Sequence, residues 1–499
     1  MIAFTAAEIA DITHGRLNAD PALIPTSVVT DSREAVPGAM YVAKPGEHAD
    51  GHDFMESAFE RGAVLALAER PVQALDGTEF PAVIVEDAVL AMGDLAREAV
   101  RRIRAERSAE GQDVTVIGIT GSAGKTTTKD LLAGILSAEG PTVAPKGSYN
   151  GEVGVPLTVF AADTDTRYLV IEMGATGIGH IKYLAGIVRP DIGVVLGVGT
   201  AHAGEFGGVE NIAKAKGELV EALAADGVAV LNLDDQRVAA MASRTIAPIL
   251  GFTSEQATAE AAVRATGVDT NDAGNPVFDL SLPGSVDQGA VEQEAVVQHR
   301  VSSQLIGRHH VGNLLAAAAA AHAAGVPAER IAEGLSRQGA ASRWRMERTE
   351  RADGVTIIND AYNANPESMR AALRTLADLG RGRRIWAVLG AMLELGEDSI
   401  REHTAVGTQV VRLNISRLLV VGREARALYV SAVQEGSWGD ECIFAETVEE
   451  AYEILTAELA PGDLVLFKSS NGVGLRHLGD RIALPPHAEA TAHEGSALL

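Results

Sequence analysis

The chain has 499 residues, of which 67 are acidic and 42 are basic, so its formal net charge is −25 at pH 7. This length exceeds what a single hydrophobic core supports, and we expect three domains. The acidic surface argues against non-specific binding to nucleic acid or to an anionic membrane. Anionic substrates must therefore be met by local basic side chains and by backbone N–H groups.

The only cysteine is Cys442, so an internal disulfide framework is excluded and a reducing cytoplasm fits. The first fifteen residues contain Glu8 and Asp11 and lack a basic segment followed by an apolar run, which argues against a signal peptide. The stretches of apolar residues all fall short of the roughly 18 that a spanning helix requires. We expect a cytoplasmic monomer with no membrane insertion.

Residues 1–108 form the first predicted domain. Its short strand-like runs, SVVT, AMYVA, AVLALA and PAVIVE, alternate with PG and DG turn signals. A charged helix follows, and the polar stretch 101–113 marks the boundary with the next domain.

Residues 109–340 form the second predicted domain. The strand DVTVIGIT, the turn GSAG and the helix KTTTKDLLAGILSAEG open it, and strands and helices alternate after that. This alternation predicts a parallel sheet covered by helices on both faces. The short alternating strands of 252–301 indicate a β insertion or a sheet edge, and a helix following Asn313 closes the domain.

Residues 341–485 form the third predicted domain. VTIIND, RIWAVLG, RLLVVG and DLVLFKSSNG are strand-like, and helices are expected over PESMRAALRTLADL and after His403. We therefore predict an α/β fold of three domains, with a central ATPase domain built on a parallel sheet and a C-terminal Rossmann-like domain. The small, polar residues 486–499 are expected to be a disordered tail.

A phosphate-binding loop is predicted at the start of the second domain. The strict pattern G-x-x-x-x-G-K-[ST] would need glycine at position 119, where the chain has Ile119. A glycine turn between a strand and a helix presents backbone N–H groups to phosphate, Lys125 adds a positive charge, and Thr126 places a hydroxyl on Mg²⁺. The loop alone leaves kinases, GTPases and ligases open, but the Asn/Thr-Lys-x-Asp motif that reads guanine is missing from the sequence.

The form T-G-[ST]-x-G-K-T-T at residues 120–127 resembles the Mur ligases, ATP-dependent amide-bond enzymes that build the stem peptide of peptidoglycan. Other segments resemble the same family in the same order along the chain. They are TDSREAVPGAMYVAKPGEHADGHDF (30–54), IEMGATGIGHI (171–181), VGTAHAGEFGG (198–208), IAKAKGE (212–218) and INDAYNANPESM (358–369).

The resemblance implies a catalytic set around two metal ions. Lys125 binds phosphate, Thr126 and Glu172 hold Mg²⁺ at the β- and γ-phosphates, and His202 helps to hold a second ion near the acyl group. Alone, Glu172 could equally be a salt-bridging residue and His202 a structural hydrogen-bonding residue. Lys216, fourteen residues after His202, matches the lysine that CO₂ carbamylates in the family, and we assign the modification to it over Lys214.

The resemblance also implies a nucleotide site. Gly121, Ser122, Gly124, Lys125, Thr126 and Thr127 belong to the phosphate loop. Asn313 matches the asparagine that contacts adenine, although its residue type also fits a helix N-cap, and both could hold. Arg345 is favoured over Arg343 as the nucleotide-contacting arginine. Asp360 and Asn363, with Tyr362 and Asn365, match the segment that closes over the ribose and phosphates when the third domain swings onto the second.

The substrate residues implied are Ser32 and Arg33 at the uridine diphosphate, with Asp50, Gly51 and His52 shaping the loop nearby. Asn150 matches the first asparagine of an N-N-x-I-G-x-P segment. Three departures from the family pattern weaken contacts with substrate: Gly151 replaces the second asparagine, Ala391 replaces an aspartate in GAMLELGEDSIREH, and KSSNGVGL (468–475) stands where relatives carry K-G-S-R.

The asparagine form of the segment 358–369 favours the branch that adds D-alanyl-D-alanine to UDP-N-acetylmuramoyl-tripeptide through an acyl phosphate, releasing ADP and phosphate. The branch that adds the third residue carries D-Y-A-H-x-P there instead. A non-catalytic paralogue is the other alternative, and the presence of the whole catalytic set argues against it. The sequence does not distinguish lysine from diaminopimelate as the third residue of the tripeptide.

Overall fold

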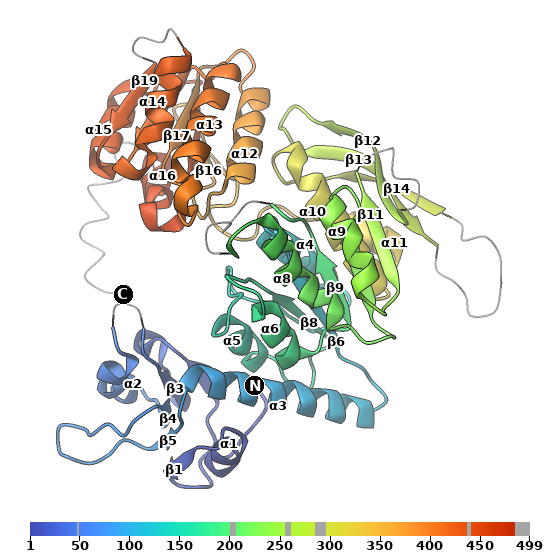
Figure 1. The fold of residues 1–499 in the computed structure, drawn as a ribbon, viewed down its shortest axis with the longest axis vertical. Coiled ribbons are helices and arrows are strands. Elements are labelled where there is room, and N and C mark those ends of the chain that lie inside the picture. The colour runs from blue at the N-terminus through green and yellow to red at the C-terminus, as the bar shows by residue number, and fades with distance from the viewer. Residues whose placement is uncertain (47–48, 200–205, 255–260, 285–295, 437–440, 485–499) are drawn as a thin grey trace.

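Three β-sheets follow one another along the chain, each with its own helices (Figure 1). The computed structural model describes residues 1–46, 49–199, 206–254, 261–284, 296–436 and 441–484. Within these residues, every helix is too short or too polar to cross a lipid bilayer. The predicted α/β class is confirmed, and so is a sheet in each of the three predicted domains. The predicted tail 486–499 lies outside the described residues.

The first sheet has five strands in the order β1-β5-β4-β3-β2, and only β1 runs antiparallel to its neighbour. Side-chain caps fix where two of its helices, α1 and α3, begin. Thr5 and Glu8 form a capping box at α1, and Asp87 accepts two backbone N–H bonds at the start of α3. The elements are α1 (Ala6–Ile12), β1 (Arg16–Asn18), β2 (Ser27–Val29), η1 (Ser32–Glu34), β3 (Ala39–Ala43), η2 (Gly51–Phe54), α2 (Met55–Glu60), β4 (Leu65–Ala68), β5 (Ala82–Ile84) and α3 (Ala88–Ala109).

The second sheet has nine strands in the order β14-β13-β12-β11-β10-β9-β6-β8-β7. In this order, the strands from β12 through β6 to β7 are parallel, as the alternation of strands and helices predicted. Strands β12, β13 and β14 form an antiparallel edge in the region predicted as a β insertion. The strands are β6 (Thr115–Thr120), β7 (Thr142–Val143), β8 (Tyr168–Glu172), β9 (Ile192–Val195), β10 (Val228–Asn232), β11 (Ile249–Thr253), β12 (Val263–Thr270), β13 (Pro276–Pro283) and β14 (Val296–Ser302). The helices are α4 (Lys125–Ser137), α5 (Gly154–Phe160), α6 (His180–Val188), α8 (Val209–Glu221), α9 (Gln236–Ala240), η3 (Met241–Arg244), η4 (Arg308–His310), α10 (Val311–Ala323) and α11 (Ala328–Arg337).

The third sheet has six strands in the order β15-β16-β20-β17-β18-β19, all parallel except β15. The helix predicted after His403 in fact contains it, because α13 begins at Ser399. The strands are β15 (Glu347–Glu350), β16 (Thr356–Asn359), β17 (Ile385–Leu389), β18 (Arg417–Val421), β19 (Cys442–Ala445) and β20 (Leu464–Lys468). The helices are α12 (Pro366–Leu379), η5 (Gly396–Asp398), α13 (Ser399–Arg412), η6 (Arg423–Ala425), α14 (Arg426–Glu435), α15 (Val448–Glu458), η7 (Asn471–Val473) and α16 (Leu475–Ala483).

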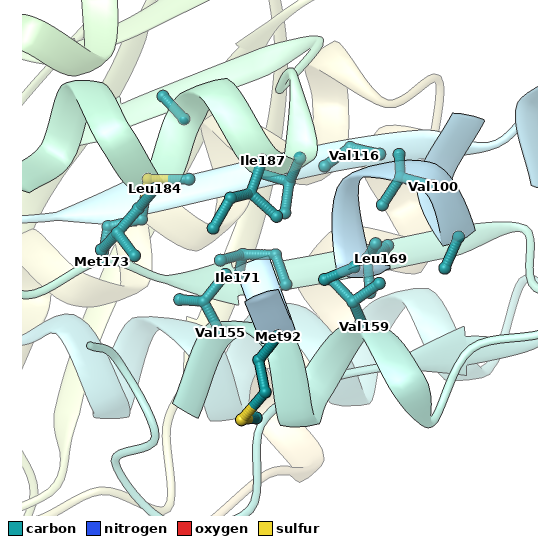
Figure 2. Packing of buried hydrophobic residues seen from close by; sticks show 14 of the residues in the cluster. Met92, Val100, Val116, Val155, Val159, Leu169, Ile171, Met173, Leu184 and Ile187 are labelled. Carbon is teal, nitrogen blue, oxygen red and sulfur yellow. The ribbon is translucent and has the colours of Figure 1, made fainter. Parts of the chain in front are cut away.

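The first and second domains share one hydrophobic core (Figure 2). Met92 and Val100 of α3 belong to the same buried cluster as Val155 of α5, Ile171 of β8 and Ile187 of α6. The core of the third domain forms two other clusters, and apart from Ile306 their buried residues all belong to the third domain. Apolar packing therefore joins the first two domains far more extensively than it joins the third domain to them.

Candidate active site

The phosphate loop lies where β6 meets α4. Gly124 is the N-cap of α4 with a φ of 85°, and a Cβ atom there would lie 2.2 Å from Oδ1 of Asn313, so the position requires glycine. The first turn of α4 supplies N–H groups that have no acceptor inside the helix. Lys125 Nζ donates to the carbonyl of Gly121 at 2.9 Å, which folds the lysine back over the loop. A helix N-terminus beside an ammonium group is suited to bind phosphate.

A chain of polar contacts joins this loop to the end of β8. Glu172 is fully buried, and its Oε1 accepts hydrogen bonds from Ser148 Oγ at 2.9 Å and from Asn150 Nδ2 at 2.7 Å. Ser148 Oγ also lies 3.3 Å from Thr126 Oγ1. Glu172 Oε2 is buried without a hydrogen-bond partner among the described residues.

This oxygen set fits Mg²⁺. The cation prefers oxygen ligands and keeps several positions for water or phosphate, so one unpartnered carboxylate oxygen beside a threonine hydroxyl is a suitable protein contribution. The described part of the chain holds no cluster of three or more His, Cys, Asp or Glu side chains that could hold a metal unaided. His202, the predicted ligand of a second ion, lies outside the described residues.

Ser148 was not predicted from the sequence. A serine in a polar loop has no periodic signal, and only its place two residues before Asn150 could have drawn attention to it. Asn150, predicted as a substrate contact, has its amide hydrogen-bonded to the buried carboxylate of Glu172.

The two lysines of α8 lie in different environments. Lys216 is 5% exposed, whereas Lys214 is exposed on the same helix. Burial, together with the charge of Lys125, lowers the pKa of Lys216 to about 7. Burial also lowers the pKa of Lys125, and Glu172 opposes that shift. A neutral amine is therefore accessible at Lys216 near neutral pH, which is the form that reacts with CO₂.

Asn313 lies in the first turn of α10 and is not its N-cap. The helix begins at Val311, its N-cap is His310, and Asn313 Nδ2 lies 3.2 Å from His310 Nδ1. The N-cap interpretation of Asn313 is therefore wrong. A Cβ atom added at Gly124 would meet Asn313 Oδ1, which places Asn313 against the phosphate loop.

The segment between the second and third domains carries the two candidate arginines. Arg345 Nη2 lies 3.4 Å from Thr126 Oγ1, and its guanidinium lies 4.4 Å from the ring centroid of Tyr362. Arg343 pairs with Asp480 at 3.0 Å. Both arginines, with Thr126 and Tyr362, line one cleft of about 400 Å³ between α4 and this segment. Of the two arginines, Arg345 is the one with a polar contact to Thr126 of the phosphate loop among the described residues.

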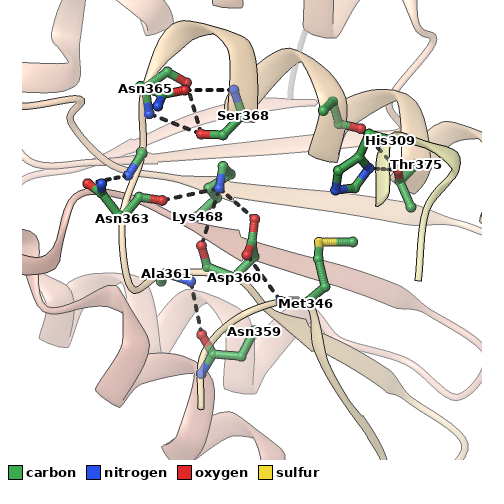
Figure 3. Close-up of polar contacts among 12 residues, drawn as sticks. His309, Met346, Asn359, Asp360, Ala361, Asn363, Asn365, Ser368, Thr375 and Lys468 are labelled. Atoms are coloured by element: carbon green, nitrogen blue, oxygen red, sulfur yellow. Dashed lines mark hydrogen bonds and ion pairs between the residues drawn. The ribbon is translucent and has the colours of Figure 1, made fainter. Parts of the chain in front are cut away.

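The predicted closing segment follows β16 in the third domain (Figure 3). Asn365 caps α12 by accepting from Ser368 N at 2.8 Å, and its Nδ2 lies 3.5 Å from the carbonyl of Ser122 in the phosphate loop. Asn363 Oδ1 accepts from the next residue's N–H. Asp360 lies at the end of β16, where ligands of open α/β sheets bind. The second and third domains thus already touch through Arg345 and Asn365.

The predicted uridine-nucleotide residues lie in the first domain. Ser32 is buried in η1, while Arg33 is exposed and paired with Asp31 at 2.6 Å. His52 Nε2 accepts from the N–H of Glu69, so its Nδ1–H donates to Asp50 at 2.6 Å. Hydrogen bonds from the backbone and ring of His52 hold the pKa of Asp50 well below its usual range. This network makes a rigid turn beside Gly51.

Comparison with known proteins agrees with this architecture. Residues 26–110 match the Mur ligase family catalytic domain, residues 119–321 the Mur ligase middle domain, and residues 344–471 the Mur ligase, glutamate ligase domain. The chain belongs to the Mur ligase family. The first match extends two residues past the predicted boundary at residue 108, and the other two lie inside residues 109–340 and 341–485 of this Mur ligase.

Individual relatives align with most of the length of this Mur ligase. The UDP-N-acetylmuramoyl-tripeptide–D-alanyl-D-alanine ligase of Mycobacterium leprae is 42% identical, with 96% of this chain and 98% of that protein aligned. The Escherichia coli protein of the same name is 34% identical over 86% of this chain and 88% of its own length. A crystal structure of MurF from Acinetobacter baumannii matches with a TM-score of 0.81 and 30% identity, covering 97% of this chain and 99% of that one. MurF from Thermotoga maritima in complex with ADP matches at 0.73 and 26% identity, covering 92% and 97%.

Proposed function

We propose that this Mur ligase joins D-alanyl-D-alanine to UDP-N-acetylmuramoyl-tripeptide at the expense of ATP, in the synthesis of peptidoglycan precursor. It is an ATP-dependent ligase of the branch whose members align with it over almost their whole length. The structural observation that carries the chemistry is the set of Lys125, Thr126, Glu172 and Lys216 around one phosphate loop, of which the last three are buried.

In the first step, the terminal carboxylate of the tripeptide attacks the γ-phosphorus of ATP, the bond to the bridging oxygen breaks, and ADP leaves. Lys125 and the N–H groups of α4 hold the phosphates and stabilise the charge that develops on them. Thr126 and Glu172, the latter oriented by Ser148, would hold Mg²⁺, which screens the repulsion between carboxylate and triphosphate.

In the second step, the free amine of the dipeptide attacks the carbonyl carbon of the acyl phosphate. The tetrahedral intermediate loses phosphate and a proton, and the amide remains. Because water would hydrolyse the acyl phosphate, the reaction needs the third domain to exclude water, and the contacts of Arg345 and Asn365 with the phosphate loop support that role.

Lys216 is proposed to carry the carbamate. Its burial and lowered pKa favour the neutral amine, and the adduct replaces a repelled cation by an anion beside Lys125. Lys216→Ala should be nearly inactive and should recover part of its activity with added short-chain carboxylates. The exposed Lys214 is the matched control, since Lys214→Ala should stay active and give no such response. Rescue of Lys214→Ala, or full activity of Lys216→Ala without additive, would show that the modification is placed wrongly.

Ser32, Arg33 and Asn150 are proposed to bind the UDP-linked substrate, with His202 at a second metal ion. Asn313, Arg345, Asp360 and Asn363 are proposed to contact the nucleotide. The domain boundaries proposed are 1–108, 109–340 and 341–485. We also propose that the enzyme acts as a monomer in the cytoplasm, where ATP and UDP-linked precursors are found.

To test the reaction, purified enzyme is incubated with ATP and Mg²⁺, and each UDP-linked precursor is combined in turn with each candidate amine. Phosphate release is measured for every combination. Release should require UDP-N-acetylmuramoyl-tripeptide together with D-alanyl-D-alanine. The lysine and diaminopimelate forms of the tripeptide are tested separately to identify the third residue. Strong turnover of the dipeptide precursor with a single amino acid would assign the chain to the branch that adds the third residue.

A further inference from the structure

Lys468 is a buried lysine at the end of β20 whose ammonium contacts a single segment of the third domain. The residue is 2% exposed, and Nζ lies 2.5 Å from Asp360 Oδ2, 3.2 Å from the carbonyl of Asn363 and 3.5 Å from the carbonyl of Asp360 (Figure 3). An ammonium group has three N–H donors, and these three acceptors match them. Lys468 therefore fixes the position of the segment that holds Asp360 and Asn363.

The second carboxylate oxygen of Asp360 continues this connection toward the phosphate loop. Asp360 Oδ1 accepts a hydrogen bond from the N–H of Met346 at 3.1 Å. Met346 and Trp344 have φ values of 53° and 58°, a left-handed conformation that non-glycine residues rarely adopt. Such a backbone persists only where surrounding contacts impose it.

Arg345 lies between these two left-handed residues. Trp344 is fixed by Nε1–H contacts to Asp480 at 3.0 Å, and Met346 is fixed by Asp360. The turn directs the guanidinium of Arg345 toward Thr126. The orientation of Arg345 thus depends on Asp360, and the orientation of Asp360 depends on Lys468.

We propose that Lys468 is a positioning residue for nucleotide binding: through Asp360 and the turn at Met346 it holds Arg345, and with it the 360–363 segment, against the phosphate loop. This inference rests on the proposed use of ATP at that loop. The segment KSSNGVGL, which departs from the pattern of the family, therefore contributes to the nucleotide site from 108 residues away in sequence.

The same strand offers a matched control at its other end. Asp463, immediately before β20, is 2% exposed and accepts from Arg384 Nε at 2.8 Å and Nη2 at 2.6 Å. Removing either cation, Lys468 or Arg384, leaves a largely buried carboxylate without its ion-pair partner, although the side chain of Arg384 is 40% exposed and that of Lys468 only 2%. Only Lys468 connects to Arg345, so only its loss should change nucleotide binding.

The test compares Lys468→Met with Arg384→Met in the full-length chain. ADP affinity is measured by calorimetry in the presence of Mg²⁺, the KM for ATP by phosphate release, and folding by circular dichroism and thermal unfolding. We expect Lys468→Met to weaken ADP binding and to raise the KM for ATP at least tenfold. Arg384→Met should lower the unfolding temperature, but its ADP affinity and its KM for ATP should stay within threefold of the wild-type values. Affinity for the UDP-linked precursor should stay within twofold in both variants.

Lys468→Arg provides the conservative comparison and replaces Lys468→Met if the latter does not fold. It keeps the charge but cannot direct its planar donors at all three acceptors, so ADP affinity should fall about three- to fivefold. Equal ADP affinity in wild type and the Lys468 variants, or equal losses in Lys468→Met and Arg384→Met, would overturn the inference and leave Lys468 a purely structural residue. Because ADP binding needs no ligation, this outcome is separate from a failure of the proposed reaction.

Discussion

Replacing the buried Lys216 by methionine should stabilise the free enzyme while it abolishes activity. Burial lowers the pKa of Lys216 from the ordinary 10.5 to about 7. At 1.36 kcal/mol per pKa unit, holding this lysine in the folded chain at pH 7 costs about 4 kcal/mol as an upper limit. Methionine fills a similar volume and carries no charge, so Lys216→Met should recover a large part of that free energy.

The pH dependence gives a second, independent check. Between pH 7 and pH 10.5 the unfolded chain binds a proton at Lys216 that the folded chain does not, so the free energy of unfolding of the unmodified wild type rises with pH through this window. The upper limit of the advantage of Lys216→Met should therefore shrink from about 4 kcal/mol at pH 7 to about 1 kcal/mol at pH 10.

The assay is urea unfolding in CO₂-free buffer at pH 7, 8, 9 and 10, followed by circular dichroism. Lys214→Met is the control, and because Lys214 is exposed its stability should match the wild type within about 0.5 kcal/mol. Added bicarbonate should raise the stability of the wild type and not that of Lys216→Met, because CO₂ binds only the folded amine. Equal stability of wild type and Lys216→Met at every pH would refute the reasoning.

Four further substitutions test the site. Lys125→Ala should lower the ligation rate by about 10³-fold or more, because the lysine stabilises the phosphate that is transferred. The affinity for the UDP-linked precursor, measured by calorimetry, should stay within twofold of the wild type. Loss of both the rate and this affinity would contradict separate sites for ATP and the precursor. Ser148→Ala removes a hydrogen bond to a buried carboxylate worth about 1.5–3 kcal/mol, so kcat should fall about 10- to 100-fold and saturation should need more Mg²⁺; an unchanged Mg²⁺ titration would contradict this role. Arg345→Ala should raise the KM for ATP at least tenfold and Arg343→Ala less than threefold, and the reverse order would favour Arg343 as the nucleotide contact.

The sequence predicted most of the sheets because their strands are continuous apolar runs between turn signals. β15 escaped prediction because its residues, ERTE, are polar and lie at the edge of a sheet, where burial leaves little pattern. The start of α10 was misjudged because Asn313 before an alanine run has the composition of an N-cap, whereas a 3₁₀ turn over Arg308–His310 starts the helix earlier.

The candidate site was predicted where residues follow one another in a motif. Lys125, Thr126 and Glu172 belong to such motifs, and the burial of Lys216 agrees with the choice made between two neighbouring lysines. Ser148 and Lys468 were missed because their roles arise from contacts with residues 24 and 108 positions away, and a single sequence carries no record of such pairs.

The continuous core formed by α3 with α5 and α6 has a consequence for exchanging parts between related enzymes. A chimera that replaces residues 1–108 alone would set a foreign α3 against Val155, Ile171 and Ile187, and mismatched side chains in a packed core destabilise a fold. A cut near residue 341 leaves the two apolar clusters of the third domain almost whole, because Ile306 is the one second-domain residue in them among the described residues, so the third domain should be the transferable module. In recombination experiments the enzyme should therefore behave as two exchangeable units, although it is built from three.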